Sequence, residues 1–228
     1  MELIMIKLNN VCKEYNNELL YNNFNIDFEE NKISCILGPS GIGKTTLVNM
    51  ITGLIIPDSG EIMLPLNSKF SYVFQEPRLL EWYSVYDNIE FVLREYYNIA
   101  ERKAIINKTL ALVGLSDFSN YKISELSGGM AQRVSLARAF AYPSNILILD
   151  EPFKGLDYKL EEDLLIKFKS IWQNDKRTVL FITHDIEQAL FLSDYIYIFN
   201  NKPVEVVYRL SMDKSLSIDA KNIIKKYL

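Results

Sequence analysis

Residues 38–46 read Gly38-Pro39-Ser40-Gly41-Ile42-Gly43-Lys44-Thr45-Thr46, a complete G-x-x-x-x-G-K-[S/T] pattern. Glycines at these positions allow the backbone N–H groups to curl around a phosphate group. The ammonium of Lys44 would reach the β and γ oxygens of a nucleotide, and the hydroxyl of Thr45 would ligate Mg²⁺. An idle glycine turn is the alternative. The predicted phosphate-binding residues are Gly38, Pro39, Ser40, Gly41, Gly43, Lys44, Thr45 and Thr46.

The segments on either side favour the phosphate loop over an idle turn. An apolar run of strand length, residues 33–37, precedes the loop, and a helix is expected from Lys44 to residue 52, before Gly53. Residues 61–64 and 70–74 are expected to form a hairpin. Further apolar strands alternate with helices later in the chain. The strands are residues 146–149, 179–182 and 195–199, and the helices lie near 160–172 and 186–192. Such alternation is typical of a parallel sheet with crossover helices.

The middle of the chain differs in character from both ends. Apolar residues recur there at helical spacing, as at Ile105, Leu112 and Leu115. We therefore expect an α/β fold with an antiparallel β edge and an inserted helical subdomain. The predicted organisation is a single domain, 1–228, in which 1–77 and 143–228 form the core and 78–142 form the helical subdomain.

Composition excludes several classes of protein. The 228 residues are 49% apolar and 24% charged, which is typical of a globular domain with a substantial core. Lys and Arg number 25 against 29 Asp and Glu, a net charge of −4, so the basic field used by nucleic-acid-binding proteins is missing. The apolar runs are far shorter than the roughly 20 residues that span a bilayer. Cys12 and Cys35 lack metal-site spacing, and we expect no secretion signal and a cytosolic location.

A pair of carboxylates completes the pattern that the phosphate loop begins. Asp150 and Glu151 follow the apolar run 146–149 directly. Ligands of open α/β sheets bind at the carboxyl ends of the strands, so Asp150 would join the shell of a Mg²⁺ ion. Glu151 would activate a water molecule for attack on the γ-phosphate. Without the phosphate loop, the same pair would read as an ordinary solvated strand end.

One further stretch carries a family resemblance. It reads Leu126-Ser127-Gly128-Gly129-Met130 and is followed by Gln132-Arg133. This stretch resembles the signature of the ATP-binding-cassette (ABC) ATPases, and it comes between the phosphate loop and the carboxylate pair, in the order typical of that family. The resemblance implies a nucleotide-binding domain of the P-loop NTPase class that uses ATP and Mg²⁺. A small-molecule kinase, which can share the loop, would leave this stretch unexplained.

The resemblance also implies roles for single residues. Tyr15 would stack on adenine, Gln75 would sense metal and water, Asp157 would be the D-loop aspartate and His184 the switch histidine. Plain core is the alternative for Tyr15, and a structural histidine is the alternative for His184. The implied catalytic residues are Glu151, His184, Gln75 and Lys44. The implied metal ligands are Thr45, Gln75 and Asp150, and Tyr15, Gln75, Ser127, Gly129 and Asp157 join the loop in nucleotide binding.

The family resemblance implies an assembly and a task. In an ATP-bound, head-to-tail homodimer, Ser127 and Gly129 of one chain would cap the γ-phosphate held by Lys44 of the other. The expected function is ATP hydrolysis that powers import of a small solute through a separate membrane permease, which in turn meets a substrate-binding protein. The chain would sit at the cytoplasmic face of the membrane and bind no nucleic acid. The alternative is a soluble ABC ATPase acting on nucleic acid or the ribosome.

Residues 75–82 are the predicted contact with the permease. They run from Gln75 to Trp82 and place Leu79, Leu80 and Trp82 in an expected loop. An aromatic anchor flanked by leucines is typical of an interface hot spot, although these side chains could instead cover the helical subdomain. The segment resembles the one in importers of the nitrate, sulfonate and taurine group and in importers of pyrimidine vitamin precursors. Glu81 replaces the proline usual there.

Overall fold

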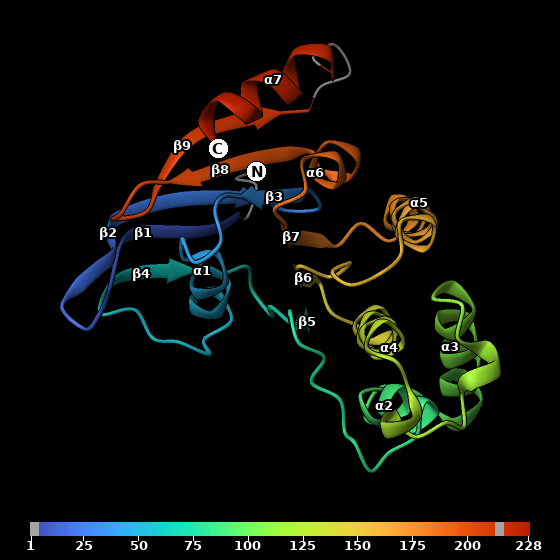
Figure 1. The fold of residues 1–228 in the computed structure, drawn as a ribbon. Helices are drawn as coiled ribbons and strands as arrows, with labels where there is room; N and C mark the ends of the chain where they lie inside the picture. The colour runs from blue at the N-terminus through green and yellow to red at the C-terminus, as the bar shows by residue number, and fades with distance from the viewer. Residues whose placement is uncertain (1–4, 213–216) are drawn as a thin grey trace. The chain divides into compact units, whose positions relative to one another are not determined.

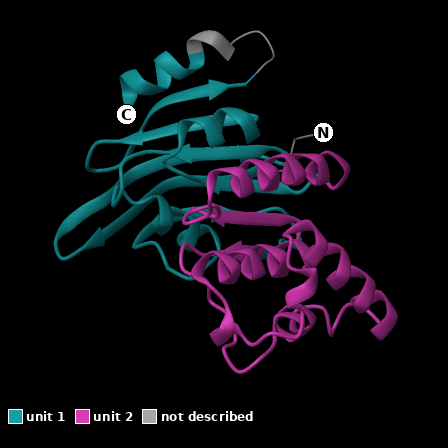
Figure 2. Cartoon of the chain, turned by 45° about the vertical axis from the view of Figure 1, so that its right-hand side comes forward, with its two compact units in different colours: residues 1–70, 176–228 teal, residues 71–175 magenta. Residues whose placement is uncertain are grey.

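The computed structural model describes residues 5–212 and 217–228, and Figure 1 shows the order of the elements along the chain. The chain divides into two compact units (Figure 2). Unit 1 consists of Met1–Phe70 and Lys176–Leu228, and unit 2 is Ser71–Asp175. The predicted core segments 1–77 and 143–228 include residues 1–4 and 213–216, which lie outside the described residues.

Unit 1 contains a three-stranded antiparallel sheet in the order β2-β1-β4. Its strands are β1 (Met5–Tyr15), β2 (Glu18–Glu29) and β4 (Ser59–Met63). Leu8 in the middle strand lies opposite Ile26 on one side and Ile62 on the other. Its side chain is fully buried, so this sheet presents one face to the core of unit 1.

The predicted hairpin between residues 61–64 and 70–74 is wrong. β4 pairs with β1, where Lys7 lies opposite Met63, and β5 (Phe70–Val73) is not a strand of this sheet. Short apolar runs identify strands but carry no information about their partners. Here β1, more than 40 residues earlier in the chain, supplies the free edge that β4 occupies.

The second sheet of unit 1 carries the phosphate loop. Its strands there are β3 (Ile33–Leu37), β7 (Thr178–Ile182), β8 (Tyr195–Asn200) and β9 (Glu205–Ser211), in the order β7-β3-β8-β9. β3 runs parallel to β7 and β8, whereas β9 is antiparallel to β8. Every residue of β3 and β7 is buried, which explains the continuous apolar runs in the sequence.

Among the residues that the structure describes, three helices belong to unit 1. They are α1 (Lys44–Ile51), α6 (Ile186–Leu192) and α7 (Ser217–Tyr227). α1 contacts β7, and α6 contacts both β3 and α7. The predicted helices after the phosphate loop and after the strand 179–182 are therefore confirmed.

Unit 2 combines two strands with a group of helices. β5 lies in this unit except for its first residue, Phe70. The other elements of unit 2 are β6 (Ile146–Asp150), α2 (Val85–Phe91), α3 (Ile99–Leu112), α4 (Gly128–Ala141), α5 (Tyr158–Asn174) and the short 3₁₀ helices η1 (Ser116–Phe118) and η2 (Ile123–Glu125). α2, α3 and α4 pack against one another in all three pairings. Within residues 5–212 and 217–228, none of the helices is both long enough and apolar enough to cross a membrane.

Side-chain caps define where the helices of unit 2 begin. Ser84 and Asp87 form a reciprocal capping box at the start of α2, and Asn98 and Glu101 form another at the start of α3. β6 is buried along its whole length and lies beside β5. The predicted helical character of the middle of the chain is confirmed, because helices account for most of residues 85–141.

Candidate active site

The phosphate loop follows β3 and contains three glycines at positions that disfavour a side chain, either because of the space around them or because of the backbone conformation. A Cβ atom at Gly38 would lie 2.6 Å from the carbonyl oxygen of Phe199, closer than real Cβ atoms approach backbone. Gly41 and Gly43 have φ angles of 74° and 118°, in the region that favours glycine. The N–H of Ile42 donates to the carbonyl of Pro39 at 3.3 Å and closes the turn. The loop is therefore shaped by its glycines, as the sequence pattern predicts.

Positive charge gathers at this loop. The Lys44 side chain is buried, and its Nζ donates to the carbonyl oxygens of Gly38 at 2.7 Å and Pro39 at 2.9 Å. Gly43 is the N-cap of α1 and has no side chain with which to cap the first N–H groups of the helix. Helix N-termini of this kind, with Lys-Thr-Thr in the first turn and no carboxylate, bind anions. The loop fits a nucleotide phosphate.

Tyr21 supports the loop from β2, and sequence reasoning missed it. Its hydroxyl donates to the carbonyl of Gly43 at 3.0 Å, and its side chain is fully buried. Burial raises the pKa of Tyr21 well above the usual range, so the hydroxyl keeps its proton and remains a donor. Tyr21 precedes Gly43 by 22 residues and is one of 14 tyrosines, so the sequence holds no signal for this contact.

Tyr15 ends β1 with an exposed ring. The side chain is 44% exposed, which argues against the plain-core alternative. Lys13 Nζ lies 5.4 Å from the ring centroid and donates to Asp58 Oδ1 at 2.7 Å. The second carboxylate oxygen of Asp58 accepts from the N–H of Glu14 at 2.7 Å, and these hydrogen bonds lower the pKa of Asp58. The end of β1 is thus fixed, while the Tyr15 ring is accessible to a flat ligand.

His184 lies in the three-residue connection between β7 and α6. Its side chain is exposed, whereas the preceding Thr183 is buried and bonds through Oγ1 to Gln188 Oε1 at 2.8 Å. Asp185, which follows, caps α6 by accepting from the N–H groups of Glu187 and Gln188 at 2.7 and 3.0 Å. His184 therefore stands on a short, well-anchored loop at the carboxyl end of a parallel strand.

Asp150 and Glu151 occupy the end of β6 in unit 2. Asp150 is the last residue of the strand and is buried. Its negative charge adds to the effect of burial in raising the pKa of Tyr72 on β5 above the usual range. Glu151 has a φ of 49°, an uncommon conformation for a residue with a side chain. Strained positions of this kind cluster at functional sites.

The signature stretch begins α4. Ser127 is the N-cap, and its hydroxyl accepts from the N–H of Met130 at 3.3 Å. A Cβ added at Gly128 would meet nothing within 4 Å, and one at Gly129 would lie 3.5 Å from the carbonyl of Gly155. The signature therefore lies beside the turn that leads to Asp157, which caps α5 by accepting from the N–H of Leu160 at 3.1 Å. The structure brings Ser127, Gly129 and the residues just before Asp157 together.

Gln132 ties the signature helix to the turn after the carboxylate pair. Its Nε2 donates to the carbonyl of Pro152 at 3.1 Å, and the side chain is 3% exposed. In the sequence, Gln132 stands out only as part of the signature, with no role of its own. Its position two residues after Met130 places it on the buried face of α4, next to the turn that Glu151 begins.

The predicted site residues are divided between the two units. Unit 1 holds Tyr15, the loop residues and His184, and unit 2 holds Gln75, Ser127, Gly129, Asp150, Glu151 and Asp157. Gln75 is exposed and is the second residue after β5. The predicted metal ligands Thr45, Gln75 and Asp150 offer hydroxyl, amide and carboxylate oxygens, the hard donors that suit Mg²⁺.

Comparison with known proteins identifies the family. The family pattern described as "ABC transporter" matches residues 21–154. The taurine import ATP-binding protein TauB of Yersinia pestis (bv. Antiqua, strain Antiqua) is 37% identical over 216 residues, which are 92% of this chain and 85% of TauB. The chain belongs to the ABC transporter family. The similarity to TauB also agrees with the resemblance to the nitrate, sulfonate and taurine group.

Two further comparisons concern how much of its relatives' length this chain spans and which fold it has. The spermidine/putrescine import ATP-binding protein PotA of Fusobacterium nucleatum is 40% identical over 212 residues, and the chain spans 56% of PotA's length. The dimeric structure of MJ0796, a bacterial ABC transporter cassette, matches with a TM-score of 0.82 and 31% identity, covering 92% of this chain and 99% of that one. The predicted fold class, an α/β nucleotide-binding domain of ABC type, is confirmed.

We expect Tyr21→Phe to weaken ATP binding, because it removes the buried hydroxyl that holds the carbonyl of Gly43 at the end of the loop and leaves that carbonyl only the N–H of Leu47. Tyr197→Phe is the matched control, since the Tyr197 hydroxyl donates to the carbonyl of Asp27 at 2.9 Å, away from the loop. Both substitutions should lower the free energy of unfolding by about 0.5–1.5 kcal/mol, the net contribution of one hydrogen bond. Only Tyr21→Phe should raise the Kd for ATP in calorimetry. Equal affinities in the two variants would show that Tyr21 does not shape the loop.

Proposed function

We propose that this chain is the ATP-hydrolysing subunit of an ABC importer. The observation that carries the proposal is the phosphate loop of a chain that belongs to the ABC transporter family, with Lys44 buried and Gly41 and Gly43 in left-handed conformations. The relatives TauB and PotA are both named import ATP-binding proteins, which supports import as the task.

Nucleotide binding would use the phosphate loop and Tyr15. The N–H groups of the loop and of the first turn of α1 would hold the phosphate oxygens, and Lys44 would pair with the β and γ charges. Stacking of adenine on the exposed Tyr15 ring would contribute roughly 1–3 kcal/mol. Thr45, Gln75 and Asp150 would hold Mg²⁺, which when bound neutralises charge that develops on the phosphates.

Hydrolysis would depend on Glu151. In the proposed step Glu151 takes a proton from a water molecule, whose oxygen attacks the γ-phosphorus while the bond to the ADP oxygen breaks. His184 would contact the γ-phosphate and Gln75 would sense it. A positioned general base contributes typically about 10²–10⁴ in rate.

Glu151→Gln should nearly abolish turnover and leave ATP binding intact, because the amide keeps the shape of the side chain but cannot accept the proton. A loss of about 10²–10⁴ in kcat is expected from phosphate release, with an unchanged Kd for ATP. The variant should also accumulate as an ATP-bound dimer in light scattering. Hydrolysis at the parental rate would mean that another group activates the water.

The proposed working form is a homodimer that encloses two ATP molecules. Ser127 and Gly129 lie at the N-terminus of α4, a position at which backbone N–H groups favour an anion. In a head-to-tail pair, this N-terminus of one chain would cap the γ-phosphate bound by Lys44 of the other.

Mixing two inactive variants tests whether the site is shared. Ser127→Arg should block the capping position, and Lys44→Ala should leave the β and γ charges without their ammonium partner, so each variant alone should hydrolyse little ATP. A heterodimer of the two has one site that lacks both changes, and activity should return on mixing. If a heterodimer forms and hydrolyses no ATP, the site is not shared between chains.

Residues 75–82 form the proposed contact with a membrane permease, and we call them the docking segment. Trp82 is 74% exposed, while Leu79 and Leu80 are partly buried. The Trp82 ring lies 6.3 Å from that of Tyr83, which lies 6.2 Å from that of the half-exposed Phe91. A row of accessible aromatic rings is typical of protein interfaces.

The assembly proposed from this contact places the chain at the cytoplasmic face of the membrane. The permease would receive the cargo from a substrate-binding protein and would bind the chain through the docking segment. The proposed cargo is a small solute, either an anion of the nitrate, sulfonate or taurine type or a pyrimidine vitamin precursor. The named task of TauB supports the first of these.

Trp82→Ala combined with Leu79→Ala should prevent co-purification with the co-expressed permease, because the pair removes the largest apolar groups of the docking segment. Leu54→Ala combined with Leu66→Ala is the matched control, since these exposed leucines belong to unit 1. Thermal unfolding of both double variants reports whether they fold. A Trp82 and Leu79 variant that still assembles and transports at the parental rate places the docking site elsewhere.

A further inference from the structure

Helix α4 connects two functional parts of unit 2. It begins beside Ser127, its N-cap, and carries Arg138 near its other end. Arg138 Nη2 donates to the carbonyl oxygen of Arg78 at 2.6 Å, and Arg78 lies in the middle of the docking segment. At 1.5 Å of rise per residue, the eleven residues from Ser127 to Arg138 span about 16 Å. One rigid element therefore joins the proposed γ-phosphate cap to the docking segment.

The hydrogen bond from Arg138 to the carbonyl of Arg78 has a charged donor. Partial burial lowers the pKa of Arg138 from its usual value, and the guanidinium stays charged. Hydrogen bonds from charged donors are roughly twice as strong as neutral ones. A displacement of α4 should therefore carry the Arg78 carbonyl with it.

Arg78 is also tied to the strand that precedes Gln75. Its guanidinium lies 4.0 Å from the ring centroid of Phe74. The Phe74 ring stacks on that of Tyr72 in β5, with centroids 3.9 Å apart and an interplanar angle of 14°. Since Gln75 follows Phe74 directly, any displacement of Arg78 also reaches the residue proposed to sense the γ-phosphate.

The far end of the docking segment is held by Asn88 of α2, which is fully buried. Its Oδ1 accepts from the N–H of Leu80 at 2.8 Å, and its Nδ2 donates to the carbonyls of Leu80 at 3.1 Å and Ser84 at 2.9 Å. Both backbone groups of Leu80 are thereby paired with one side chain. Trp82 lies between Leu80 and Ser84 in the chain, and both of these residues are bonded to Asn88. A movement of α2 should therefore also move Trp82.

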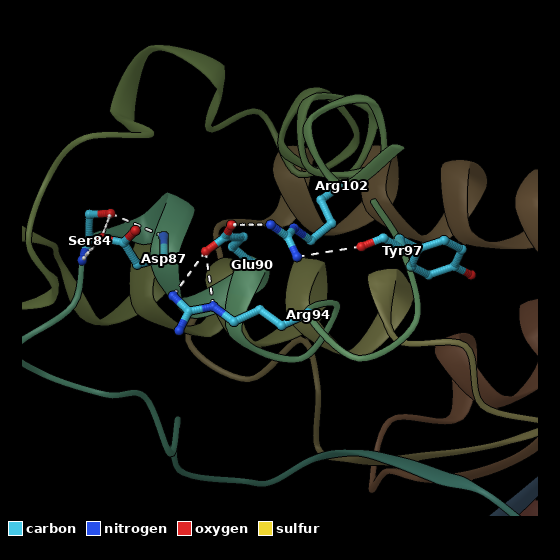
Figure 3. Close-up of polar contacts among 6 residues, drawn as sticks. All are labelled: Ser84, Asp87, Glu90, Arg94, Tyr97 and Arg102. Carbon is cyan, nitrogen blue, oxygen red and sulfur yellow. Dashed lines mark hydrogen bonds and ion pairs between the residues drawn. The ribbon is translucent and has the colours of Figure 1, made fainter. Parts of the chain in front are cut away.

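α2 is itself fixed to the start of α3, as Figure 3 shows. Glu90 accepts from Arg94 Nε and Nη2 at 3.1 and 2.9 Å and forms an ion pair with Arg102 at 3.3 Å. Arg102 also donates to the carbonyl of Tyr97 at 3.4 Å. Because α2 and α3 both pack against α4, the three helices should move together, with the docking segment bonded to two of them.

We infer that Arg138 is a positioning residue that transmits the ATP-bound state of Ser127 to the docking segment through its bond to Arg78. The inference rests on the proposed ATP-dependent pairing of two chains. It assigns Arg138 a role in coupling, distinct from the residues that contact ATP or the permease.

Trp82 provides the readout in the chain itself. The sequence has two tryptophans, and Trp172 on α5 is buried. Trp172→Phe therefore leaves Trp82 as the single source of tryptophan fluorescence. In a background that also carries Glu151→Gln, addition of ATP and Mg²⁺ should form the dimer, measured by light scattering. It should also change both the emission of Trp82 and its quenching by acrylamide.

Three substitutions in this background test the inference. Arg138→Met keeps most of the packing but removes the donor, and it should abolish the ATP-dependent change at Trp82 while the dimer still forms. Arg138→Lys retains one donor and should keep part of the change. Arg133→Met is the control, because Arg133 is also a partly buried arginine of α4 but donates to the carbonyls of Val113 and Gly114 at 3.0 and 3.3 Å. It should retain the change.

Hydrogen exchange provides a second measurement. In Arg138→Met, ATP should still slow exchange in residues 128–132 but no longer alter exchange in residues 76–82. An undiminished Trp82 response in Arg138→Met, or an equal loss in Arg133→Met, overturns the inference and leaves the proposed function standing. If the background variant forms no ATP-bound dimer at all, the proposed pairing fails and the inference falls with it.

Discussion

The close approach of two backbones at the end of β3 constrains the rest of the site. Leu37 lies opposite Ile198 in the parallel pair of β3 and β8. At the next residue, Gly38, an added Cβ atom would lie 2.6 Å from the carbonyl oxygen of Phe199. Any side chain there would separate the strands or push the loop away. The parallel pairing thus fixes the point at which the phosphate loop leaves the sheet, and the Lys44 ammonium then bonds to the first two carbonyls of the loop.

Side-chain donors hold several loops of the candidate site in place. Tyr21 bonds to the carbonyl of Gly43, Gln132 to that of Pro152, Arg138 to that of Arg78, and Asn88 to that of Leu80. Each of these carbonyls lies outside the strands and helices, although those of Gly43 and Leu80 also accept from the N–H groups of Leu47 and Tyr83. A hydrogen bond to such a carbonyl favours the one loop geometry in which the donor reaches it.

Left-handed backbone conformations separate structural turns from the candidate catalytic turn. Among the described residues, seven of the eight non-glycine residues with positive φ are asparagines, which adopt this region at low cost. The eighth is Glu151. Its carboxylate is therefore presented on a strained turn at the end of a fully buried strand, and the Gln132 bond to Pro152 helps to hold that turn.

Local patterns in the sequence were enough to predict the class of fold and to nominate the residues proposed to bind and hydrolyse ATP. The phosphate loop, the buried strands and the signature are such patterns, because glycine conformations, burial on both faces and helix N-termini are properties of consecutive residues. The partners of these segments became known from the three-dimensional structure. It paired β4 with β1 in place of the expected β5, and it brought Tyr21, Gln132 and Arg138 to loops 20 to 60 residues away in the chain. A side-chain donor is chosen by its distance in space from an unpaired carbonyl, and spacing along the chain does not encode that distance.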